Sequence, residues 1–393
     1  MKTENEYYKN NDPKKKTIYE SMDEFIKSKY DLRLNTISPK YEIRLIGRDA
    51  WKVLEIESLL IELEGQGITC SISKLEIYLK SWFVEKYNPI QDYFRTLPEW
   101  DQSRDYIAEY ASYVPLLEPE RFVYHLKKWL VRAIKCSLQE GYINKQCLLL
   151  VHAGQNSGKS TWCRDLCPDG LKNYYTEDIG HGKDANIQLA NNFIVAFDDF
   201  DGESKSDLGV KKAMMSKSFI NERLPYDRTN SQLARICSFI GSTNQGTFLK
   251  DDTGSVRWLP FEMNGVINFN YKNEMNIDDI WSQAYYLAYY DKSFDASITI
   301  EDIREIERKN GKYRELSPEE EIITEYYEPS NDMVDFKTAT QIVKDLSDLK
   351  LRLSSVNMGK ALTAKKFRRV KNSKKDCYGY LAKQLFDNSP MEV

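Results

Sequence analysis

The segment LLLVHAGQNSGKSTW, residues 148–162, restricts most strongly how this chain can fold. Four aliphatic residues lead into a short polar turn and then into Gly-Lys-Ser-Thr. A buried strand, a turn of small residues and a helix in this order form the phosphate-binding loop of an α/β protein, with the pattern G-x-x-x-x-G-K-[ST]. This chain has Ala153 at the first position and a glycine directly after it. A coincidental Gly-Lys-Ser turn is the alternative interpretation.

In a phosphate-binding loop, backbone N–H groups and the start of the helix surround the phosphates. Gly158 would permit close approach of the backbone, Lys159 would bind the β- and γ-phosphates, and Ser160 would coordinate Mg²⁺. Asn156 stands where a glycine would be convenient, and asparagine accepts left-handed backbone angles more readily than most residues. We therefore expect ATP and Mg²⁺ as cofactors. The expected nucleotide-binding residues are Gly154, Gln155, Asn156, Ser157, Gly158, Lys159, Ser160 and Thr161.

Polar side chains that would complete such a site follow two later apolar runs. FIVAFDD ends in Asp198, which would hold Mg²⁺, and in Asp199, which would orient the attacking water. CSFIGSTN ends in Asn244, which suits contact with the γ-phosphate or with that water. Arg257 is a candidate arginine finger for the ATP of a neighbouring subunit, or alternatively a surface or salt-bridged arginine. Together, these elements in this order are more specific than any one alone.

The apolar pattern divides the chain into five segments and indicates an α/β fold class. The expected segments are a disordered N-terminus (1–20), a helical lead-in domain (21–141), a P-loop ATPase core (142–265), a helical lid or linker (266–330) and a basic winged-helix-like C-terminal domain (331–393). Within the core, the runs CLLLVHA, FIVAFDD, ICSFIGSTN and VRWLPFEM are the expected buried strands.

Composition narrows the class of protein. Of the 393 residues 41% are hydrophobic and 30% are charged, and no apolar run approaches the roughly 20 residues of a membrane span. The polar start MKTENEYYKNNDPKKK has no signal-peptide core. We therefore expect a cytoplasmic protein without a membrane partner. The seven scattered cysteines indicate reduced thiols, since Cys163-x3-Cys167 has no second pair with which to form a zinc site.

A stretch of basic and aromatic residues precedes the strand that ends at Asn244. The sequence KSFINERLPYDRTNSQLAR alternates such side chains around a Leu-Pro pair. This pattern suits a hairpin that meets phosphates and stacks on bases. Its candidate DNA-binding residues are Lys217, Arg223, Tyr226, Arg228 and Arg235. A solvated surface hairpin is the alternative.

The C-terminal segment is strongly basic in a chain whose net charge is -4. From Phe336 to Lys383 there are thirteen Lys or Arg residues and three Asp or Glu residues. This asymmetry indicates an anionic partner. Apolar spacing through Ala339, Ile342 and Leu346 argues for a folded winged-helix module rather than a solvated, lysine-rich terminus. The candidate phosphate contacts, with salt-dependent binding and little base specificity, are Lys365, Lys366, Arg368, Arg369, Lys371, Lys374 and Lys375.

The order of the phosphate loop, FDDFD, the basic stretch, SFIGSTN and FLKDDTGSVRW resembles the virulence-associated E proteins. These are ATPases of bacteria, phages and mobile elements that are similar to superfamily 3 helicases and to the helicase part of primase-helicases. YDLRLNTISPKYEIR and YNPIQDYFRTLPEWD extend the resemblance, which covers roughly residues 25–385. The chain departs from the family pattern at Ala153, Asn156, Asp199 and Val256. These departures concern the rate of ATP hydrolysis more than the fold.

The resemblance implies an AAA+-like core of the superfamily 3 type in a homo-oligomer. The expected assembly is a hexameric ring with ATP between subunits and single-stranded DNA at the centre. The leading hypothesis is an ATP-dependent, helicase-like replication protein that acts on single-stranded DNA or a forked duplex. An ATP-switched DNA-binding or initiator protein, with slow hydrolysis and no unwinding, is the alternative. A small-molecule P-loop kinase is less favoured, because it gives no role to the basic tail.

Overall fold

The computed structural model describes residues 16–177, 179–180, 182–198, 204–223, 230–249, 255–349, 351–373 and 376–385. The chain divides into two compact units, one of residues 1–201, 209–245 and 256–304 and one of residues 202–208, 246–255 and 305–393. The linker expected at 266–330 is thus divided between the two units. No helix in the described part of the chain is long and apolar enough to cross a membrane.

The N-terminal part of the first unit mixes helices with a small sheet, and this corrects the helical domain expected for 21–141. Its elements are α1 (Ile18–Lys29), β1 (Tyr30–Asn35), β2 (Lys40–Leu45), β3 (Lys52–Val53), α2 (Ile56–Gly65), α3 (Ile72–Leu79) and β4 (Glu85–Tyr87), with the strand order β3-β2-β1-β4. YDLRLN and KYEIRL have the two-residue period of strands, which the surrounding helical pattern obscured.

Helix α1 begins inside the segment that was expected to be disordered. Thr17 and Glu20 form a capping box that starts this helix. The prediction of disorder for residues 1–20 is therefore wrong for its last residues, and residues 1–15 lie outside the described residues.

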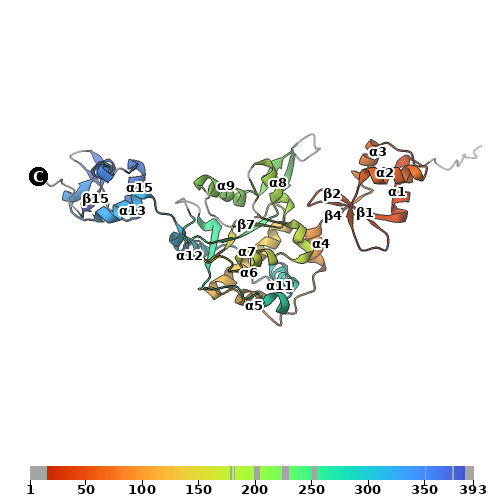
Figure 1. Ribbon diagram of the computed structural model, residues 1–393, viewed down its shortest axis with the longest axis horizontal. Coiled ribbons are helices and arrows are strands. Elements are labelled where there is room, and N and C mark those ends of the chain that lie inside the picture. Colours follow the sequence, from red (N-terminus) through yellow and green to blue (C-terminus); the bar gives the residue numbers. More distant parts are fainter. Residues whose placement is uncertain are drawn as a thin grey trace, which may run out of the picture. The chain divides into compact units, whose positions relative to one another are not determined.

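Four helices pack against one another within the first unit: α4 (Pro89–Thr96), α5 (Tyr106–Ser112), α6 (Pro119–Leu138) and α11 (Ile277–Tyr289) (Figure 1). Helix α6 is buried along most of its length. Its Trp129 donates a hydrogen bond to the carbonyl oxygen of Phe239 at 3.1 Å. Burial lowers the pKa of Arg132 to about 10. Lys128 and Asp302 form a buried ion pair at 2.8 Å, which joins α6 to α12 (Ile300–Asn310).

Five parallel strands form the central sheet of the first unit, in the order β11-β5-β10-β7-β6. Their bounds are β5 (Cys147–Val151), β6 (Tyr175–Glu177), β7 (Ile194–Asp198), β10 (Ser238–Thr243) and β11 (Trp258–Glu262). This sheet confirms the α/β class. Four of the strands coincide with the predicted apolar runs, whereas β6 is the short polar sequence Tyr-Thr-Glu. Because β10 lies between β5 and β7, the residues that follow these three strands meet at one edge of the sheet.

The remaining elements before the C-terminal module connect these strands and helices. They are α7 (Lys159–Asp165), η1 (Asp169–Tyr174), α8 (Lys183–Asn191), α9 (Lys205–Ser216), β8 (Phe219–Glu222), β9 (Ser231–Ala234), η2 (Ser255–Arg257) and α10 (Tyr271–Glu274). Strands β8 and β9 pair antiparallel. The hairpin predicted between the acid strand and the strand ending at Asn244 is thereby confirmed.

In its described residues, the second unit consists largely of helices and a small antiparallel sheet. Its elements are η3 (Gly311–Tyr313), α13 (Pro318–Tyr326), β12 (Tyr327–Pro329), η4 (Met333–Asp335), β13 (Phe336–Lys337), α14 (Ala339–Asp345), η5 (Ser347–Leu349), α15 (Ser355–Ala364), β14 (Arg369–Asn372) and β15 (Cys377–Gln384). Strand β15 pairs with β12, β13 and β14.

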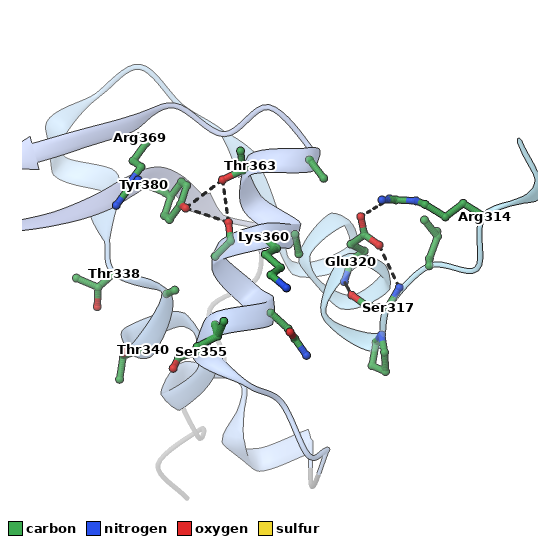
Figure 2. A pocket seen from close by; sticks show the side chains of 18 of the residues that line it. Arg314, Ser317, Glu320, Thr338, Thr340, Ser355, Lys360, Thr363, Arg369 and Tyr380 are labelled. Carbon is green, nitrogen blue, oxygen red and sulfur yellow. Dashed lines mark hydrogen bonds and ion pairs between the residues drawn. The ribbon is translucent and has the colours of Figure 1, made fainter. Parts of the chain in front are cut away.

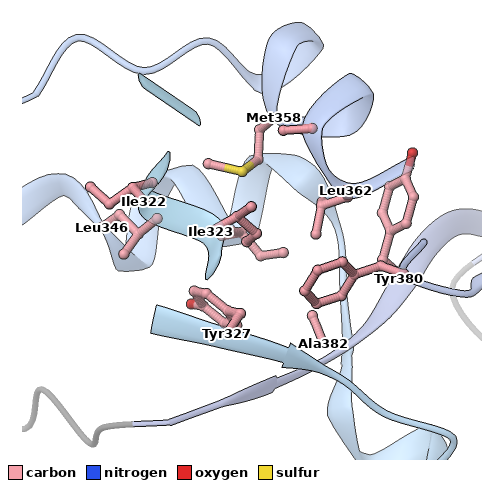
Figure 3. Packing of buried hydrophobic residues seen from close by; sticks show 11 residues of the cluster. Ile322, Ile323, Tyr327, Leu346, Met358, Leu362, Tyr380 and Ala382 are labelled. Atoms are coloured by element: carbon pink, nitrogen blue, oxygen red, sulfur yellow. The ribbon is translucent and has the colours of Figure 1, made fainter. Parts of the chain in front are cut away.

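The core of the second unit joins its helices to its sheet (Figure 3). Ile323 of α13 and Leu362 of α15 are fully buried together with Ala382 of β15. Because α13 supplies part of this core, the C-terminal module begins before residue 331, where the sequence analysis placed its start. The Ser317–Glu320 capping box starts α13. The apolar spacing of α14 indeed reflects a folded module, since Ile342 is completely buried.

Candidate functional site

The loop between β5 and α7 contains residues in left-handed backbone conformations. Asn156 has a φ angle of 56° and Gly158 one of 89°, so asparagine does adopt the conformation anticipated from the sequence. A Cβ atom at Gly154 would lie 2.8 Å from the ring of His152. A Cβ atom at Gly158 would lie 2.6 Å from the ring of Phe269. A side chain at either position would force the neighbouring ring to move, and at Gly158 the positive φ angle would add backbone strain.

Lys159, the first residue of α7, directs its ammonium group into this loop. The side chain is almost completely buried, with 6% of its surface exposed. Its Nζ donates to the carbonyl oxygens of His152 (3.1 Å) and Gly154 (3.2 Å), to Ser157 Oγ (3.0 Å) and to Asn244 Oδ1 (2.9 Å). The ammonium group therefore lies between the loop and the residue that follows β10.

Two hydroxyl groups and a carboxylate form a cluster beside this lysine. Ser160 Oγ donates to Asp198 Oδ1 at 2.7 Å, and Ser242 Oγ donates to the same oxygen at 2.6 Å. The strand order β5-β10-β7 explains their proximity, since Ser242 lies on β10 and Asp198 ends β7.

The oxygen atoms of this cluster match the ligands that Mg²⁺ prefers. In proteins, Mg²⁺ is usually held by one or two carboxylates, waters and substrate phosphates rather than by a complete protein cage. Across the described residues, no three His, Cys, Asp or Glu side chains come together as a metal site. Asp198 and Ser160 therefore suit a metal ion whose remaining ligands come from a bound phosphate compound and water.

A cavity of about 380 Å³ opens over this edge of the sheet. Its lining consists of Gln155, Asn156, Ser157, Gly158, Lys159, Ser160, Thr161, Asp198, Ser242, Thr243 and Asn244. The cavity lies in the lower part of the range of about 300–1,000 Å³ that is typical of small-molecule sites. The structure thus brings the predicted loop together with Asp198 and Asn244, from three different strands or strand ends.

Two predicted catalytic residues, Asp199 and Arg257, are not among the described residues that line this cavity. Asp199 lies outside the described residues. Arg257 is in η2, where its Nε donates to Ser216 Oγ at 2.8 Å, and it does not line the cavity.

Two residues of the site, Ser242 and His152, were not predicted from the sequence. Ser242 lies two residues before Asn244, and the two-residue period of a strand is a signal that could have found it. His152 directly follows β5, and its Nδ1 accepts a hydrogen bond from the Gly154 N–H at 3.1 Å. No pattern in the sequence distinguishes this histidine from an ordinary loop residue.

The cysteines near the sheet are structural rather than reactive. All seven are free thiols in the structure, and six of them are buried. Burial raises the pKa values of Cys147 and Cys163. Both thiols are also buried, so their environment disfavours the thiolate form that reacts as a nucleophile.

At the base of the β8–β9 hairpin, Arg235 does not contact solvent, which corrects its prediction as a DNA-binding residue. It is 1% exposed. Its guanidinium donates to the carbonyl oxygens of Lys217 (2.7 Å), Cys237 (2.6 Å) and Asn144 (3.1 Å). Alternation along the sequence could not distinguish this arginine from an exposed one, because its burial depends on segments distant in the chain.

The other hairpin candidates differ in accessibility. Lys217 is half-buried and donates to Asn186 Oδ1 at 2.5 Å. Arg223 is exposed at the end of β8 that leads to the hairpin tip. Tyr226 and Arg228 lie outside the described residues.

The basic residues of the C-terminal unit lie mostly on its surface. Lys366, Arg368, Arg369 and Lys371 are exposed and Lys365 is half-buried. Lys371 forms an ion pair with Asp376 at 2.8 Å. Lys374 and Lys375 lie outside the described residues.

A family model described as the virulence-associated protein E-like domain matches residues 94–315, more than half of the chain. The chain belongs to the virulence-associated protein E-like family. This match confirms the resemblance that the motifs carried. It covers the central sheet and all of the loop residues described above, and it is narrower than the range of roughly 25–385 suggested by the sequence segments.

Solved structures extend the similarity in fold beyond the matched domain. Two apo structures of the C-terminal region of NrS-1 are similar to this member of the family at 13% sequence identity. One has a TM-score of 0.52 and covers 93% of this chain and 99% of that region, and the other has a TM-score of 0.50 and covers 94% and 100%. No curated protein matches the chain. At this identity the similarity concerns the fold alone.

Proposed function

We propose that this virulence-associated protein E-like protein is an ATPase that binds DNA and moves along a single strand. The central observation is the convergence of Lys159, Ser160, Asp198 and Asn244 on one cavity at the carboxyl edge of a parallel sheet. A buried ammonium group, a hydroxyl–carboxylate pair and a glycine-containing loop are the groups that ATP and Mg²⁺ require. The fold class that follows from this proposal is a P-loop NTPase of the superfamily 3 type.

Lys159 is positioned for phosphate binding because its ammonium group already lies among oxygen acceptors in the loop. A phosphate entering the cavity would replace some of these acceptors with stronger, charged ones. The backbone N–H groups of the loop and the N-terminus of α7 would contact the same phosphate groups. Ser160 and Asp198 would hold Mg²⁺, which would neutralise charge on the phosphates.

Hydrolysis requires groups that orient water and stabilise charge in the transition state. Asn244 contacts Lys159 and lies where it can orient a water beside the terminal phosphate. Asp199 follows Asp198 directly in the sequence and is the proposed base for that water. Arg257 lies in η2 outside the lining of the cavity, which suits a residue that acts on the ATP of a second copy of the chain.

The proposed DNA contacts lie on the β8–β9 hairpin and on the C-terminal unit. Arg223 is exposed near the hairpin tip, and Tyr226 and Arg228 extend the basic and aromatic pattern in the sequence. In the proposed hexameric ring, hairpins from successive subunits would contact single-stranded DNA. The winged-helix-like C-terminal unit would add a second contact to DNA. We propose a role in replication of a phage or mobile element, in the cytoplasm.

Lys159→Ala tests this proposal. We expect ATP turnover to fall at least about 100-fold, because the substitution removes the charge that stabilises the transferring phosphoryl group, and unwinding of a forked duplex to be lost. Lys172→Ala is the matched control, since Lys172 is an exposed lysine that pairs with Asp169 outside the cavity. Unchanged turnover in Lys159→Ala would refute the proposed site.

An ATP-switched DNA-binding or initiator protein is the second candidate function. The sequence favours it at two positions: Asp199 is one methylene shorter than the glutamate usual there, and Ala153 replaces a loop glycine. Both changes would slow hydrolysis more than binding. This candidate predicts ATP-dependent DNA binding in Asp199→Asn that equals that of the wild type, with no strand separation by either protein. If the wild type separates the strands and Asp199→Asn does not, this second candidate function is excluded.

A further inference from the structure

A second cavity lies within the C-terminal unit and has no role in the proposed ATP site. It has a volume of about 1,020 Å³. We call it the α15 groove, because α15 contributes more of its lining than any other element. Figure 2 shows α15 with Thr338, Thr340 and Arg369 on one side and with Arg314 and Glu320 on the other.

Helix α15 presents polar side chains with unused hydrogen-bonding capacity to this groove. Ser355, Asn357 and Lys360 are exposed and line it. Among the described residues, neither the Asn357 amide nor the Lys360 ammonium group has a hydrogen-bond or ion-pair partner. The opposite face of α15 is apolar, with Met358 and Leu362 fully buried. The helix is therefore held by its buried apolar face, and its exposed face carries these polar side chains together with Val356.

The charge of the groove favours an anionic partner. Residues 354–375 include eight Lys or Arg residues and no Asp or Glu. Of the two acids that line the groove, Glu320 is buried and pairs with Arg314. Glu315 is exposed. Because the charge of Glu320 is balanced by Arg314, Glu315 is the acid that reduces the positive charge of the groove.

The β14–β15 hairpin forms another wall of the groove. The Arg369 guanidinium lies over the Tyr378 ring at 5.0 Å, so its position is restricted while its donors stay accessible. Tyr380 donates to the Gly359 carbonyl oxygen at 2.9 Å, which connects the hairpin to α15. The helix and the hairpin thus present their cationic groups from a connected framework.

We propose that the α15 groove binds duplex DNA, with the exposed face of α15 in the major groove. The major groove is about 12 Å wide and admits one α-helix. Asparagine pairs with adenine and lysine with guanine, so Asn357 and Lys360 would contact base edges. Arg369 and Lys366 would contact phosphates and orient the unit. This inference rests on the DNA-binding part of the proposed function. It differs from the expectation from the sequence, which was that the C-terminal unit binds DNA with little base specificity.

A single strand fits the groove less well than a duplex. Sequence-tolerant binding of single strands depends on exposed aromatic rings on which bases stack. Two aromatic residues line this groove. Tyr380 is 8% exposed, whereas Tyr378 is 59% exposed and has the Arg369 guanidinium over its ring, so one partly covered ring is the stacking surface that the groove offers. Single-stranded DNA and acidic peptides therefore become the competitors in the test.

The first experiment measures binding of the full chain to a labelled 20-bp duplex, without nucleotide, by fluorescence anisotropy. We expect Lys360→Ala to weaken duplex binding about 10-fold. The same substitution should weaken binding of the separated strands less than about twofold. Lys344→Ala is the matched control, since Lys344 is exposed on α14 outside the groove. Equal effects of both substitutions, or equal loss for duplex and single strands, would overturn the proposal. Displacement of the duplex by polyglutamate, added at the same concentration of negative charges as the duplex, would also overturn the proposal.

The second experiment tests base recognition by selecting bound sequences from a randomised duplex pool. We expect the wild-type protein to enrich a short motif and Asn357→Ala to lose preference at one or two positions, each by roughly 5- to 100-fold. Absence of any motif with the wild type would overturn base recognition. Lys159→Ala separates the two proposals, since it should bind the duplex as the wild type does. If ATPase activity is absent while the duplex and motif results hold, the ATP site alone has failed.

Discussion

Single residues of the β5–α7 loop explain why a sequence that departs from the usual glycine pattern still forms a tight turn. Asn156 adopts a left-handed conformation in place of a glycine, with a φ angle of 56°. Gly154 is needed for a different reason, namely the ring of His152 beside it. Gly154 lies one position after the usual glycine of the pattern. Its lack of a side chain leaves room for the ring of this histidine.

Gly154→Ala tests this steric role. The new Cβ atom would lie 2.8 Å from the His152 ring, so the ring and the loop must move apart. We expect nucleotide affinity to fall about 10-fold, because the loop carbonyl that contacts Lys159 shifts with them. Gly209→Ala is the control, since nothing lies within 4 Å of a Cβ atom there. Restoration of affinity by the double substitution His152→Ala and Gly154→Ala would support the contact as the cause, and no restoration would contradict it.

At the scale of elements, the β8–β9 hairpin separates supporting residues from accessible ones. Arg235 bonds three carbonyl groups beneath the hairpin, whereas Arg223 is exposed at its far end. Both arginines fit the same basic and aromatic pattern in the sequence. Their roles are nevertheless expected to be opposite, one in stability and one in binding.

Paired substitutions distinguish these roles. We expect Arg235→Met to lower the free energy of unfolding by about 2–4 kcal/mol, because it leaves buried carbonyl oxygens without donors. Arg223→Ala should leave thermal stability unchanged and weaken binding to single-stranded DNA by about 3- to 10-fold. Thermal unfolding and anisotropy measure the two effects. A stable Arg235→Met protein, or an Arg223→Ala protein that binds DNA normally, would contradict this division.

The ion pair between α6 and α12 should make stability depend on pH. Burial tends to raise the pKa of Asp302, but hydrogen bonds from Lys128 and the Thr299 backbone outweigh it and lower the pKa overall. The stabilisation is therefore present above the unfolded-state pKa, near 4, and lost as the pH falls through the lower folded-state value. We expect Asp302→Asn to be about 3 kcal/mol less stable at neutral pH. This difference in stability between the variant and the wild type should become smaller below about pH 4. Thermal unfolding at several pH values measures it. A difference that does not change with pH would contradict the role of the ion pair.

At the scale of the whole molecule, the chain consists of two units with different chemistry. The first carries the parallel sheet and the cavity with Lys159 and Asp198. The second carries the basic module and the α15 groove. Under the proposed function, Arg257, which does not line the cavity in its own chain, would act on the ATP of a second copy.

We therefore expect the mass of the protein in solution to depend on nucleotide. With a non-hydrolysable ATP analogue and Mg²⁺, the assembly should approach six times the 46.0 kDa of one chain. Arg257→Ala should still assemble but turn over ATP at least about 100-fold more slowly, because the arginine acts on the neighbour's ATP. Light scattering and an ATPase assay measure both effects. A monomer with full ATPase activity would contradict the role of a second copy.

The sequence alone determined the features that depend on local pattern. Continuous apolar runs predicted four strands of the parallel sheet, because strands buried on both faces need no polar residues. The order of the motifs predicted that Asp198 and Asn244 belong with the loop, and these residues do meet in one cavity, whereas Arg257 does not line it. The N-terminal sheet was not predicted, since its short strands lie within a largely helical pattern.

Only the tertiary structure decided which similar residues have different environments. Ser242 joins Ser160 and Asp198 because β10 lies between β5 and β7, and no local pattern encodes that strand order. Arg235 is buried because segments distant in the sequence cover it. The α15 groove likewise arises where helices and a hairpin meet. Strand and helix patterns depend on neighbouring residues, so the sequence alone could predict them. Burial and proximity depend on contacts between distant segments, so only the tertiary structure could show them.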